Sequence, residues 1–291
     1  MERRMFLQLL GGIGASALAA ADTWLPACCA SGESPNPPMD RGLLSRRNQN
    51  RSTVISRHGM VCTAVPSASM AGIDILQAGG SAIDAAIAAN VMLSLVEPMS
   101  CGPGGDLFAI VWSEKDRKLF GLNASGRSPY DWGLQQALDM GLKEIPVDSP
   151  LSWSVPGCVS GWAALHERFG KLEFSRLLEP AIEQGRAGFP LSPIVAQGWL
   201  SGPDNRPGLR STYLPDGRPM HYGTIFKNPD LASVSETLAR EGPQAFYQGE
   251  IAERIVKFSQ AHGGRFSLRD FRDHKADWVE PVSTSYRGYD V

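Results

Sequence analysis

Residues 79–96 read GGSAIDAAIAANVMLSLV, and this stretch decides the fold. The two glycines end one helix, and Ser81 then caps a second helix that we expect over residues 82–96. Asp84 falls in its first turn, where a carboxylate suits the helix dipole. The helix is apolar on nearly every face, so it should be buried on nearly every face. The stretch therefore predicts a central pair of buried helices packed on a sheet.

The pattern upstream of this helix predicts two short strands and the first helix of the pair. The strands are expected over residues 53–56 and 59–65, and Pro66 ends the second of them. Ser67 is a good N-cap for a helix over residues 69–78, where apolar side chains recur at helical spacing. The ordered chain should therefore begin with the first of these strands.

Downstream, a glycine-rich loop leads into a hairpin. Residues 99–106 read MSCGPGGD, and residues 107–112 read LFAIVW, an apolar run that predicts a strand buried on both faces. Residues 113–118 form a charged turn, and residues 119–123 return as the partner strand. A dinucleotide-binding loop has the opposite order of strand, glycines and helix, so we reject that interpretation.

The rest of the chain is predicted to be mostly helical, without repeats or a domain linker. Amphipathic patterns, glycine stops and a serine cap indicate the remaining elements. They are helices over residues 157–169, 172–185, 229–240 and 250–261, a surface loop over 200–219, a short turn over 267–271 and a strand-like end over 282–291.

Composition places the chain among soluble globular proteins. Its 291 residues are 43% hydrophobic and 20% charged, so a large core can form without a disulfide framework. The formal net charge of −2 argues against nucleic acid as the main partner, because phosphate binding needs a basic face.

Sequence motifs for cofactors and metals are missing. The chain has no Walker loop and no GxSxG motif, and His166-Glu167 lacks the second histidine of a zinc motif. Cys62, Cys101 and Cys158 are widely spaced and are interpreted as small buried residues. We therefore expect no metal site and no cofactor.

Residues 1–30 have the layout of an export signal. Arg3-Arg4 precede a weakly apolar run over residues 11–21, which resembles a twin-arginine signal peptide. The run is too short for a membrane span of roughly 20 apolar residues, although a short N-terminal anchor is the alternative. We expect an exported protein located in the periplasm or otherwise outside the cytoplasm.

Two cysteines lie at the end of the signal region, and a polar stretch follows it. Residues 25–28 (LPAC) loosely resemble a lipoprotein cleavage box with Cys28 as the lipid site, and ordinary cleavage near residues 27–30 fits as well. Residues 31–52 are polar and Pro-rich, which is typical of a disordered tether. Membrane contact is thus expected only through the signal or a lipid anchor, and the folded domain should span residues 53–291.

Several blocks of sequence resemble the N-terminal part of the γ-glutamyltransferase (γ-glutamyltranspeptidase) family. They occur in the family's order, which is more specific than any single block, and they cover nearly all of the chain after about residue 58. The GGDLF and GRSP variants look closer to the bacterial branch with cephalosporin-acylase-like members than to typical glutathione-degrading enzymes. The blocks are ASMAGIDIL (68–76), GGSAIDAAIAA (79–89), VEP (96–98), GPGGDLFA (102–109), GRSP (126–129), SVPG (154–157), FYQG (246–249) and YRGY (286–289).

This resemblance implies an α+β fold, the four-layer αββα sandwich of the N-terminal-nucleophile hydrolases. Family members are made as one precursor that cleaves itself. The new N-terminal Thr is the nucleophile, and its free amine is the base. It attacks the γ-amide carbonyl of γ-glutamyl compounds such as glutathione, and water or an amino acid then takes the acyl group.

By the same resemblance, that Thr would lie well beyond the position of Val291. We therefore expect an incomplete sandwich, the large-subunit part only, truncated at its C-terminus. No catalytic residue is expected in this chain, which alone should neither cleave itself nor turn over substrate. Its expected partners are a γ-glutamyl or related small molecule and the small-subunit portion of the same precursor.

The resemblance assigns one substrate-binding residue to this chain, Arg127, which would grip the α-carboxylate of the substrate. A guanidinium suits that role because it offers a planar, two-pronged donor with a fixed charge. Judged by position alone, Arg127 is an exposed arginine at a hairpin end. The family commonly follows this arginine with Glu where this chain has Ser128, so the fine substrate preference stays open.

Three functional interpretations remain open. The first is a γ-glutamyltransferase or hydrolase, and the second is a glutaryl or cephalosporin acylase of the same superfamily. The third is a non-catalytic truncated remnant or binding protein that kept the Arg127 pocket. A Gly-rich stretch and an internal Thr encoded after Val291 would favour the enzymes.

Overall fold

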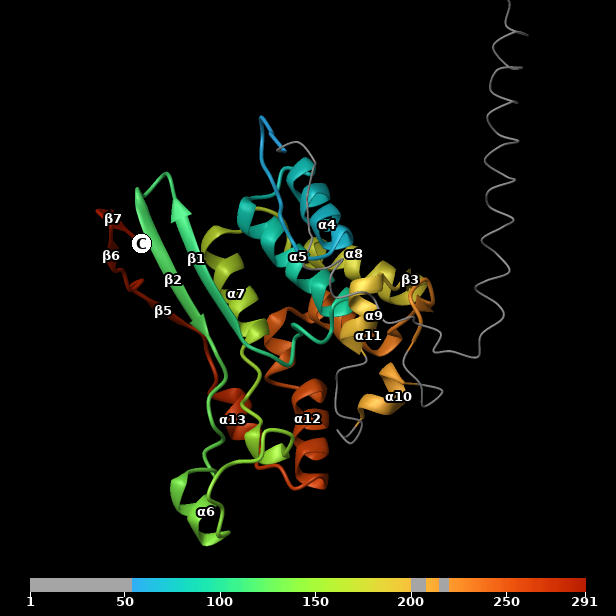
Figure 1. Ribbon diagram of the computed structural model, residues 1–291, viewed down its shortest axis with the longest axis vertical. Coiled ribbons are helices and arrows are strands. Elements are labelled where there is room, and N and C mark those ends of the chain that lie inside the picture. The colour runs from blue at the N-terminus through green and yellow to red at the C-terminus, as the bar shows by residue number, and fades with distance from the viewer. Residues whose placement is uncertain (1–53, 200–207, 215–219) are drawn as a thin grey trace, which may run out of the picture. The chain divides into compact units, whose positions relative to one another are not determined.

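In the computed structural model, Val54–Val291 form one compact unit (Figure 1). The predicted signal peptide (1–30) and tether (31–52) lie outside the described residues. Within the described part, no helix is both long enough and apolar enough to cross a membrane. The structure describes residues 54–199, 208–214 and 220–291.

Helix α5 (Ala82–Val96) is the buried helix that the sequence predicts. Its N-terminus is a capping box, in which Ser81 Oγ accepts a hydrogen bond from Asp84 N at 3.0 Å and Asp84 Oδ2 accepts one from Ser81 N at 2.8 Å. The same Oδ2 also accepts from Lys171 N at 2.9 Å and from Leu172 N at 3.2 Å. The fully buried Asp84 therefore ties the start of α5 to a loop almost ninety residues away.

Helix α4 (Pro66–Gln77) packs along α5 and begins earlier than predicted. Its N-cap is Val65 rather than Ser67, and Pro66 occupies the first turn, where its missing N–H is no loss. The strands predicted over 53–56 and 59–65 are absent from the described residues 54–65. Val61 packs instead against α4, so close to Gly72 that a Cβ there would lie 2.8 Å from its Cγ1.

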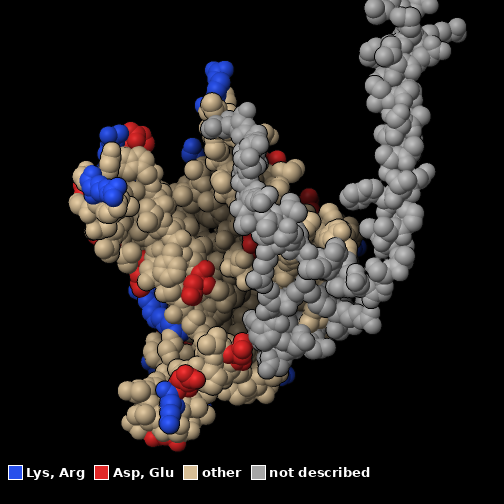
Figure 2. Space-filling model, viewed as in Figure 1, with Lys and Arg blue, Asp and Glu red and all other residues tan. Residues whose placement is uncertain are grey.

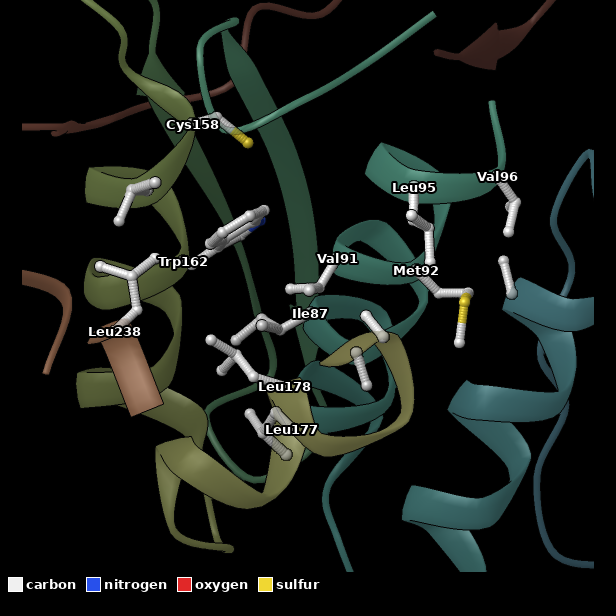
Figure 3. Close-up of a cluster of buried hydrophobic side chains, with 14 of the residues drawn as sticks. Ile87, Val91, Met92, Leu95, Val96, Cys158, Trp162, Leu177, Leu178 and Leu238 are labelled. Carbon is white, nitrogen blue, oxygen red and sulfur yellow. The ribbon is translucent and has the colours of Figure 1, made fainter. Parts of the chain in front are cut away.

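Three further helices complete a helical core around α5 (Figure 3). They are α7 (Cys158–Phe169), α8 (Phe174–Ala187) and α11 (Pro229–Glu241). Trp162 of α7 is buried at the centre, and its Nε1 donates a hydrogen bond to Asn90 Oδ1 at 2.8 Å. The predictions of buried helices in this region are confirmed.

Strands β1 (Leu107–Ser113), β2 (Lys118–Ala124) and β5 (Asp277–Val279) form an antiparallel sheet in the order β1-β2-β5. The hairpin over 107–123 is confirmed, but the prediction that its first strand is buried on both faces is wrong. Side chains alternate, and those of Leu107, Ala109 and Val111 pack towards the core.

The other face of β1 is open in the described part of the chain. Phe108, Ile110 and Trp112 are exposed, Ile110 by 73%. In Figure 2, charged side chains gather at the hairpin tip, and uncharged atoms cover the strands beside it. The sequence shows that residues 107–112 are all apolar, but it does not show whether one face of the strand is covered by other parts of the protein or both faces are.

The remaining elements lie around the helical core and the three-stranded sheet, and most of them are short. The predicted loop over 200–219 contains a helix, and the strand-like end over 282–291 forms a small hairpin. The elements are α6 (Leu134–Asp139), η1 (Pro150–Ser152), β3 (Phe189–Pro190), α9 (Pro193–Trp199), α10 (Leu209–Tyr213), β4 (Ile225–Phe226), η2 (Pro243–Phe246), α12 (Glu250–Ala261), α13 (Leu268–Arg272), β6 (Ser285–Tyr286) and β7 (Tyr289–Asp290).

Candidate functional site

Loops from distant parts of the sequence meet just beyond the end of β2. Asp106, in the loop before β1, accepts a hydrogen bond through Oδ1 from Gly126 N at 2.6 Å. The Arg127 carbonyl accepts one from Val155 N at 2.9 Å. The GPGGD, GRSP and SVPG blocks of the sequence are thus brought together in space.

Two glycines make this close approach possible. The Gly105 carbonyl accepts a hydrogen bond from Gly157 N at 2.9 Å, and a Cβ on Gly157 would lie only 2.0 Å from the Ala124 carbonyl oxygen. A Cβ on Gly126 would lie 2.3 Å from the Val155 carbonyl oxygen. Any side chain at these positions would push the loops apart, because such distances are far below van der Waals contact.

The Arg127 guanidinium is held by strand β5 and the residues before it. Its Nη2 forms an ion pair with Asp277 Oδ2 at 2.5 Å, and its Nη1 donates to the Lys275 carbonyl at 2.9 Å. The Arg127 and Asp277 side chains are both half exposed. Arg127 lies just past the end of β2, at the open end of the hairpin and opposite its turn at residues 114–117.

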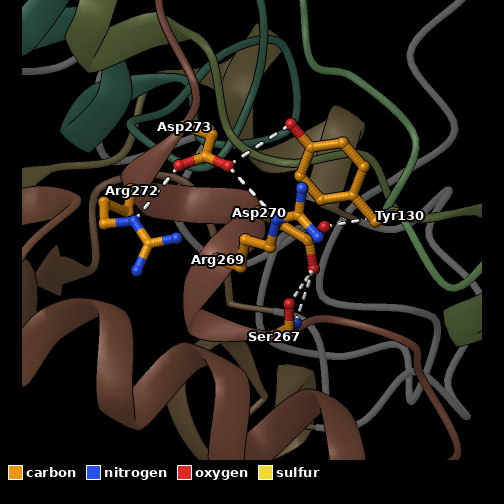
Figure 4. Close-up of polar contacts among 6 residues, drawn as sticks. All are labelled: Tyr130, Ser267, Arg269, Asp270, Arg272 and Asp273. Atoms are coloured by element: carbon orange, nitrogen blue, oxygen red, sulfur yellow. Dashed lines mark hydrogen bonds and ion pairs between the residues drawn. The ribbon is translucent and has the colours of Figure 1, made fainter.

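The chain after Arg127 is anchored to α13 (Figure 4). The buried carboxylate of Asp270 accepts hydrogen bonds from Tyr130 N at 2.7 Å and from Ser267 N at 2.6 Å. Arg269 stacks over the Tyr130 ring, with its guanidinium carbon 4.4 Å from the ring centroid. Because α13 precedes β5, one short segment holds both the guanidinium of Arg127 and the backbone three residues further on.

Tyr247, from the FYQG block, packs against the SVPG turn and hydrogen-bonds to its backbone. Its hydroxyl donates to the Pro156 carbonyl and accepts from Ser160 N, both at 2.9 Å. Burial raises the pKa of this phenol, so the hydroxyl keeps its proton and its donor role.

We expect Tyr247→Phe to lower the free energy of unfolding by about 2 kcal/mol, because it leaves a buried carbonyl and an N–H without their partner. Urea denaturation followed by circular dichroism measures the change. Tyr286→Phe is the matched control, since Tyr286 is 63% exposed and should tolerate the same loss. Equal stability of the two variants would contradict the supporting role of Tyr247.

His274 lies beside this turn, and no sequence motif pointed to it. Its Nε2 is 3.3 Å from Ser160 Oγ, its ring stacks on Tyr247, and its Nδ1 has no hydrogen-bond partner within the described residues. Burial lowers the pKa of this imidazole, and the charge of Arg127 lowers it further, against opposing effects of Asp277 and Asp106. The neutral ring is therefore favoured next to the Arg127 ion pair.

The cysteines differ from one another in burial. Cys158 is buried at the start of α7, and burial raises the pKa of its thiol to about 12. It is a packing residue, because a thiol that keeps its proton is a poor nucleophile. Cys101 is partly buried, whereas Cys62 is exposed, which corrects the expectation that all three are buried. In the part of the chain that the structure describes, no group of His, Cys, Asp or Glu is placed to hold a metal.

The loop blocks that build this site are those that resemble one enzyme family, and comparison with known proteins tests that resemblance. A family model described as gamma-glutamyltranspeptidase matches residues 68–291. The chain belongs to the gamma-glutamyltranspeptidase family. The predicted family is thereby confirmed.

Relatives of two kinds share this family. Glutathione hydrolase 3 of Arabidopsis thaliana is 33% identical over 82% of this chain and 38% of its own length. The glutathione hydrolase-like YwrD proenzyme of Bacillus subtilis is 35% identical over 82% of this chain and 46% of its own length. The crystal structure of cephalosporin acylase from Bacillus halodurans is 34% identical, with a TM-score of 0.77, and the match covers 90% of this chain and 48% of that one.

These likenesses confirm the predicted fold class, an α+β chain with the N-terminal-nucleophile hydrolase fold. The chain spans less than half the length of the two curated relatives named above. The role of Arg127 stays a prediction. Asp277, which lies 150 residues from Arg127 in sequence, was missed because only the pairing of β2 with β5 brings it there.

Proposed function

We propose that this chain supplies the scaffold and a substrate-binding arginine of an enzyme that acts on γ-glutamyl amides such as glutathione. Arg127 grips the α-carboxylate of the substrate. The observation that carries the proposal is the half-exposed guanidinium of Arg127, set where three family sequence blocks converge. A site that binds a carboxylate needs a permanent positive charge, and it needs a rigid backbone that holds this charge in place. Arg127 supplies the charge, and the hydrogen-bonded loops around it supply the rigid backbone.

The chemistry follows the family's pattern. A Thr at a new N-terminus, supplied by the small-subunit portion of the precursor, attacks the γ-amide carbonyl. Its own amine takes the hydroxyl proton and passes it to the leaving amine. Water or an amino acid then accepts the acyl group. Within this proposal residues 1–291 provide no catalytic residue, and hydrolysis of γ-glutamyl-p-nitroanilide by the purified chain alone would contradict it.

An acylase acting on glutaryl or cephalosporin side chains is the second candidate. It is favoured by the 34% identity to a cephalosporin acylase over 90% of this chain. Both candidate enzymes need a positively charged side chain to bind the carboxylate of the substrate. In a γ-glutamyl substrate an α-ammonium group lies beside that carboxylate, whereas a glutaryl substrate has none. A non-catalytic binding protein that retains Arg127 is the third candidate.

The enzyme is proposed to work outside the cytoplasm. Support comes from the Arg3-Arg4 pair and the weakly apolar run over residues 11–21. Cys28 is a proposed lipid site, and mass spectrometry of the mature N-terminus distinguishes lipid attachment there from ordinary cleavage.

Binding to the chain tests the role of Arg127 directly. We expect Arg127→Ala to weaken binding of γ-L-glutamylethylamide by at least about tenfold, because it removes a charge-assisted fork. Arg127→Lys should restore only part of the affinity, since an ammonium cannot donate in the same two-pronged geometry. Isothermal titration calorimetry measures both.

Arg117→Ala is the matched control for that measurement. Arg117 also forms an exposed ion pair, with Glu114 at 2.5 Å, but lies at the hairpin turn. Its loss should leave the affinity unchanged. Wild-type affinity in Arg127→Ala would show that the carboxylate binds elsewhere.

A further inference from the structure

We propose that His274 is a positioning residue of the candidate site. In its neutral form the imidazole links the segment over residues 273–277 to the start of α7, and this segment holds the Arg127 guanidinium. The role is indirect, because His274 acts through the Lys275 carbonyl and the Asp277 carboxylate. The inference rests on the proposed function, in which Arg127 binds the carboxylate of the substrate.

The segment over residues 273–277 runs between two fixed elements. α13 precedes it, and the His274 N–H donates a hydrogen bond to the Phe271 carbonyl at 3.1 Å. β5 begins at its other end, where Asp277 pairs with Asn123 of β2. Within this segment, all of which the structure describes, only His274 is buried. This ring is therefore the side chain through which the interior of the protein can best fix the segment.

The hydrogen bond at Nε2 shows which nitrogen of the ring carries the proton. Ser160 Oγ lies 3.3 Å from His274 Nε2 and donates its own proton to the Gly157 carbonyl at 2.8 Å. A hydroxyl has a single proton, so His274 Nε2–H must be the donor to Ser160. Ser160 is fixed in turn, because its N–H donates to the Tyr247 hydroxyl at 2.9 Å. The neutral ring thus joins the segment to a residue that α7 and Tyr247 hold in place.

The surroundings of the ring disfavour a second proton. His274 is 8% exposed, and its Nδ1 has no hydrogen-bond partner within the described residues. Protonation would create an N–H group there without an acceptor and would bury a charge, and both changes cost free energy. The geometry therefore favours the neutral imidazole.

Charged groups on the surrounding elements act on the ring in both directions. Arg127 disfavours a positive imidazole, whereas Asp106 and Asp277 favour it. The Tyr247 phenol and the Cys158 thiol have raised pKa values and stay uncharged. The groups on these elements are Arg127 past β2, Asp106 before β1, Asp277 in β5, Asp270 in α13, the exposed sequence neighbours Asp273 and Lys275, Tyr247 after η2 and Cys158 in α7.

The direction of the pH effect follows from this balance. Burial, and then the charge of Arg127, lower the pKa of His274 from the ordinary value of 6.5. The unfolded chain therefore binds this proton at a higher pH than the folded chain does. The folded arrangement around His274 is fully stable above about pH 6.5 and loses stability as the pH falls below that value, so the link to α7 weakens in acid.

Loss of this link should be felt at Arg127. The Lys275 carbonyl and the Asp277 carboxylate hold its two Nη atoms, and both residues follow closely after His274 in the chain. A shift of the segment would take away the fixed geometry on which carboxylate binding depends. The added charge itself should have little direct effect on γ-L-glutamylethylamide, because the amino acid end of this ligand carries one positive and one negative charge.

Two substitutions at His274 separate the hydrogen bond from the charge. His274→Gln keeps an N–H donor near the place of Nε2 and cannot be protonated near neutral pH, whereas His274→Phe keeps a stacked ring and removes the donor. Isothermal titration calorimetry measures binding of γ-L-glutamylethylamide to the full chain between about pH 5 and about pH 8. We expect the wild-type affinity to be constant above about pH 7 and to fall by about threefold or more by about pH 5.

The variants should differ from the wild type in opposite ways. His274→Gln should bind within about twofold of the wild type at about pH 7.5 and should show no fall in acid. His274→Phe should bind at least about fivefold more weakly throughout. His58→Gln is the matched control, because His58 is exposed, and it should keep both the affinity and the pH dependence of the wild type. Thermal melts check that each variant is folded.

Nitrogen NMR of protein with labelled histidines tests the tautomer without any ligand. The resonances that are missing from His274→Gln identify the ring. We expect the Nε2–H tautomer above about pH 7 and a titration midpoint below about pH 6.5. A proton on Nδ1 in the neutral ring, or a midpoint above that value, would contradict the inference.

The outcomes separate this inference from the proposed function. If Arg127→Ala loses the ligand but His274→Phe binds as the wild type does, or if His274→Gln keeps the fall in acid, the role of His274 is wrong and the arginine site stands. If Arg127→Ala binds as the wild type does, or if the wild type does not bind, the arginine site and this inference are both wrong.

Discussion

Asp84→Ala is expected to lower the free energy of unfolding by about 4 kcal/mol, because it removes a fully buried acceptor that three backbone N–H groups share. Asp84 Oδ2 accepts hydrogen bonds from Ser81 N, Lys171 N and Leu172 N, and the side chain is fully buried. Its loss removes both a helix cap and the link between α5 and the loop before α8. Urea denaturation of the two proteins measures the difference.

If Asp84 acted only through the helix dipole, its loss would lower the free energy of unfolding by much less. A control variant at another first-turn carboxylate separates the dipole effect from the loss of the hydrogen bonds. Asp230 occupies the first turn of α11 but is exposed, so Asp230→Ala should cost about 0.5 kcal/mol. Asp84→Asn retains an acceptor oxygen of the same shape and should fall between the two. If Asp84→Ala were no worse than Asp230→Ala, the link between α5 and the α8 loop would contribute nothing to stability.

Gly157→Ala is expected to destabilise the protein by about 3 kcal/mol, because the added Cβ would collide with backbone rather than with a movable side chain. It would lie 2.0 Å from the Ala124 carbonyl oxygen. To relieve that contact, α7 must move away from the end of β2 and break the bond from Gly157 N to the Gly105 carbonyl. Thermal denaturation measures the loss, and weaker γ-L-glutamylethylamide binding should accompany it.

Gly104→Ala is the control within the same group of loops. A Cβ at Gly104 would meet nothing within 4 Å, so the change should alter stability by less than about 1 kcal/mol. Equal melting temperatures for the two variants would mean that the loops can separate freely, and the rigid site described above would be wrong.

The helical core could be predicted from local sequence because its signals are local. Ser81 and Asp84 form the capping box within four residues, and the apolar run over residues 82–96 specifies burial by itself. The apolar run over residues 107–112 was harder to interpret. It shows that the strand is apolar, but not which layer covers each face.

The site depends on contacts that no local pattern contains. Arg127 was identified through the resemblance of its GRSP block to one family. Asp277 and His274 reach it only after β5 pairs with β2, which is a contact across about 150 residues. Neither residue belongs to a motif, so single-sequence reasoning had nothing from which to infer their position.

The anchoring of Tyr130 by Asp270 has a thermodynamic consequence for the neighbouring arginine. A segment held at its backbone and at its guanidinium has already lost most of its conformational entropy on folding. A ligand that docks there need not order the loop, so its affinity should depend mainly on how much water the ion pair must release. Binding enthalpies should accordingly vary with salt concentration, while the heat capacity change on binding should stay small.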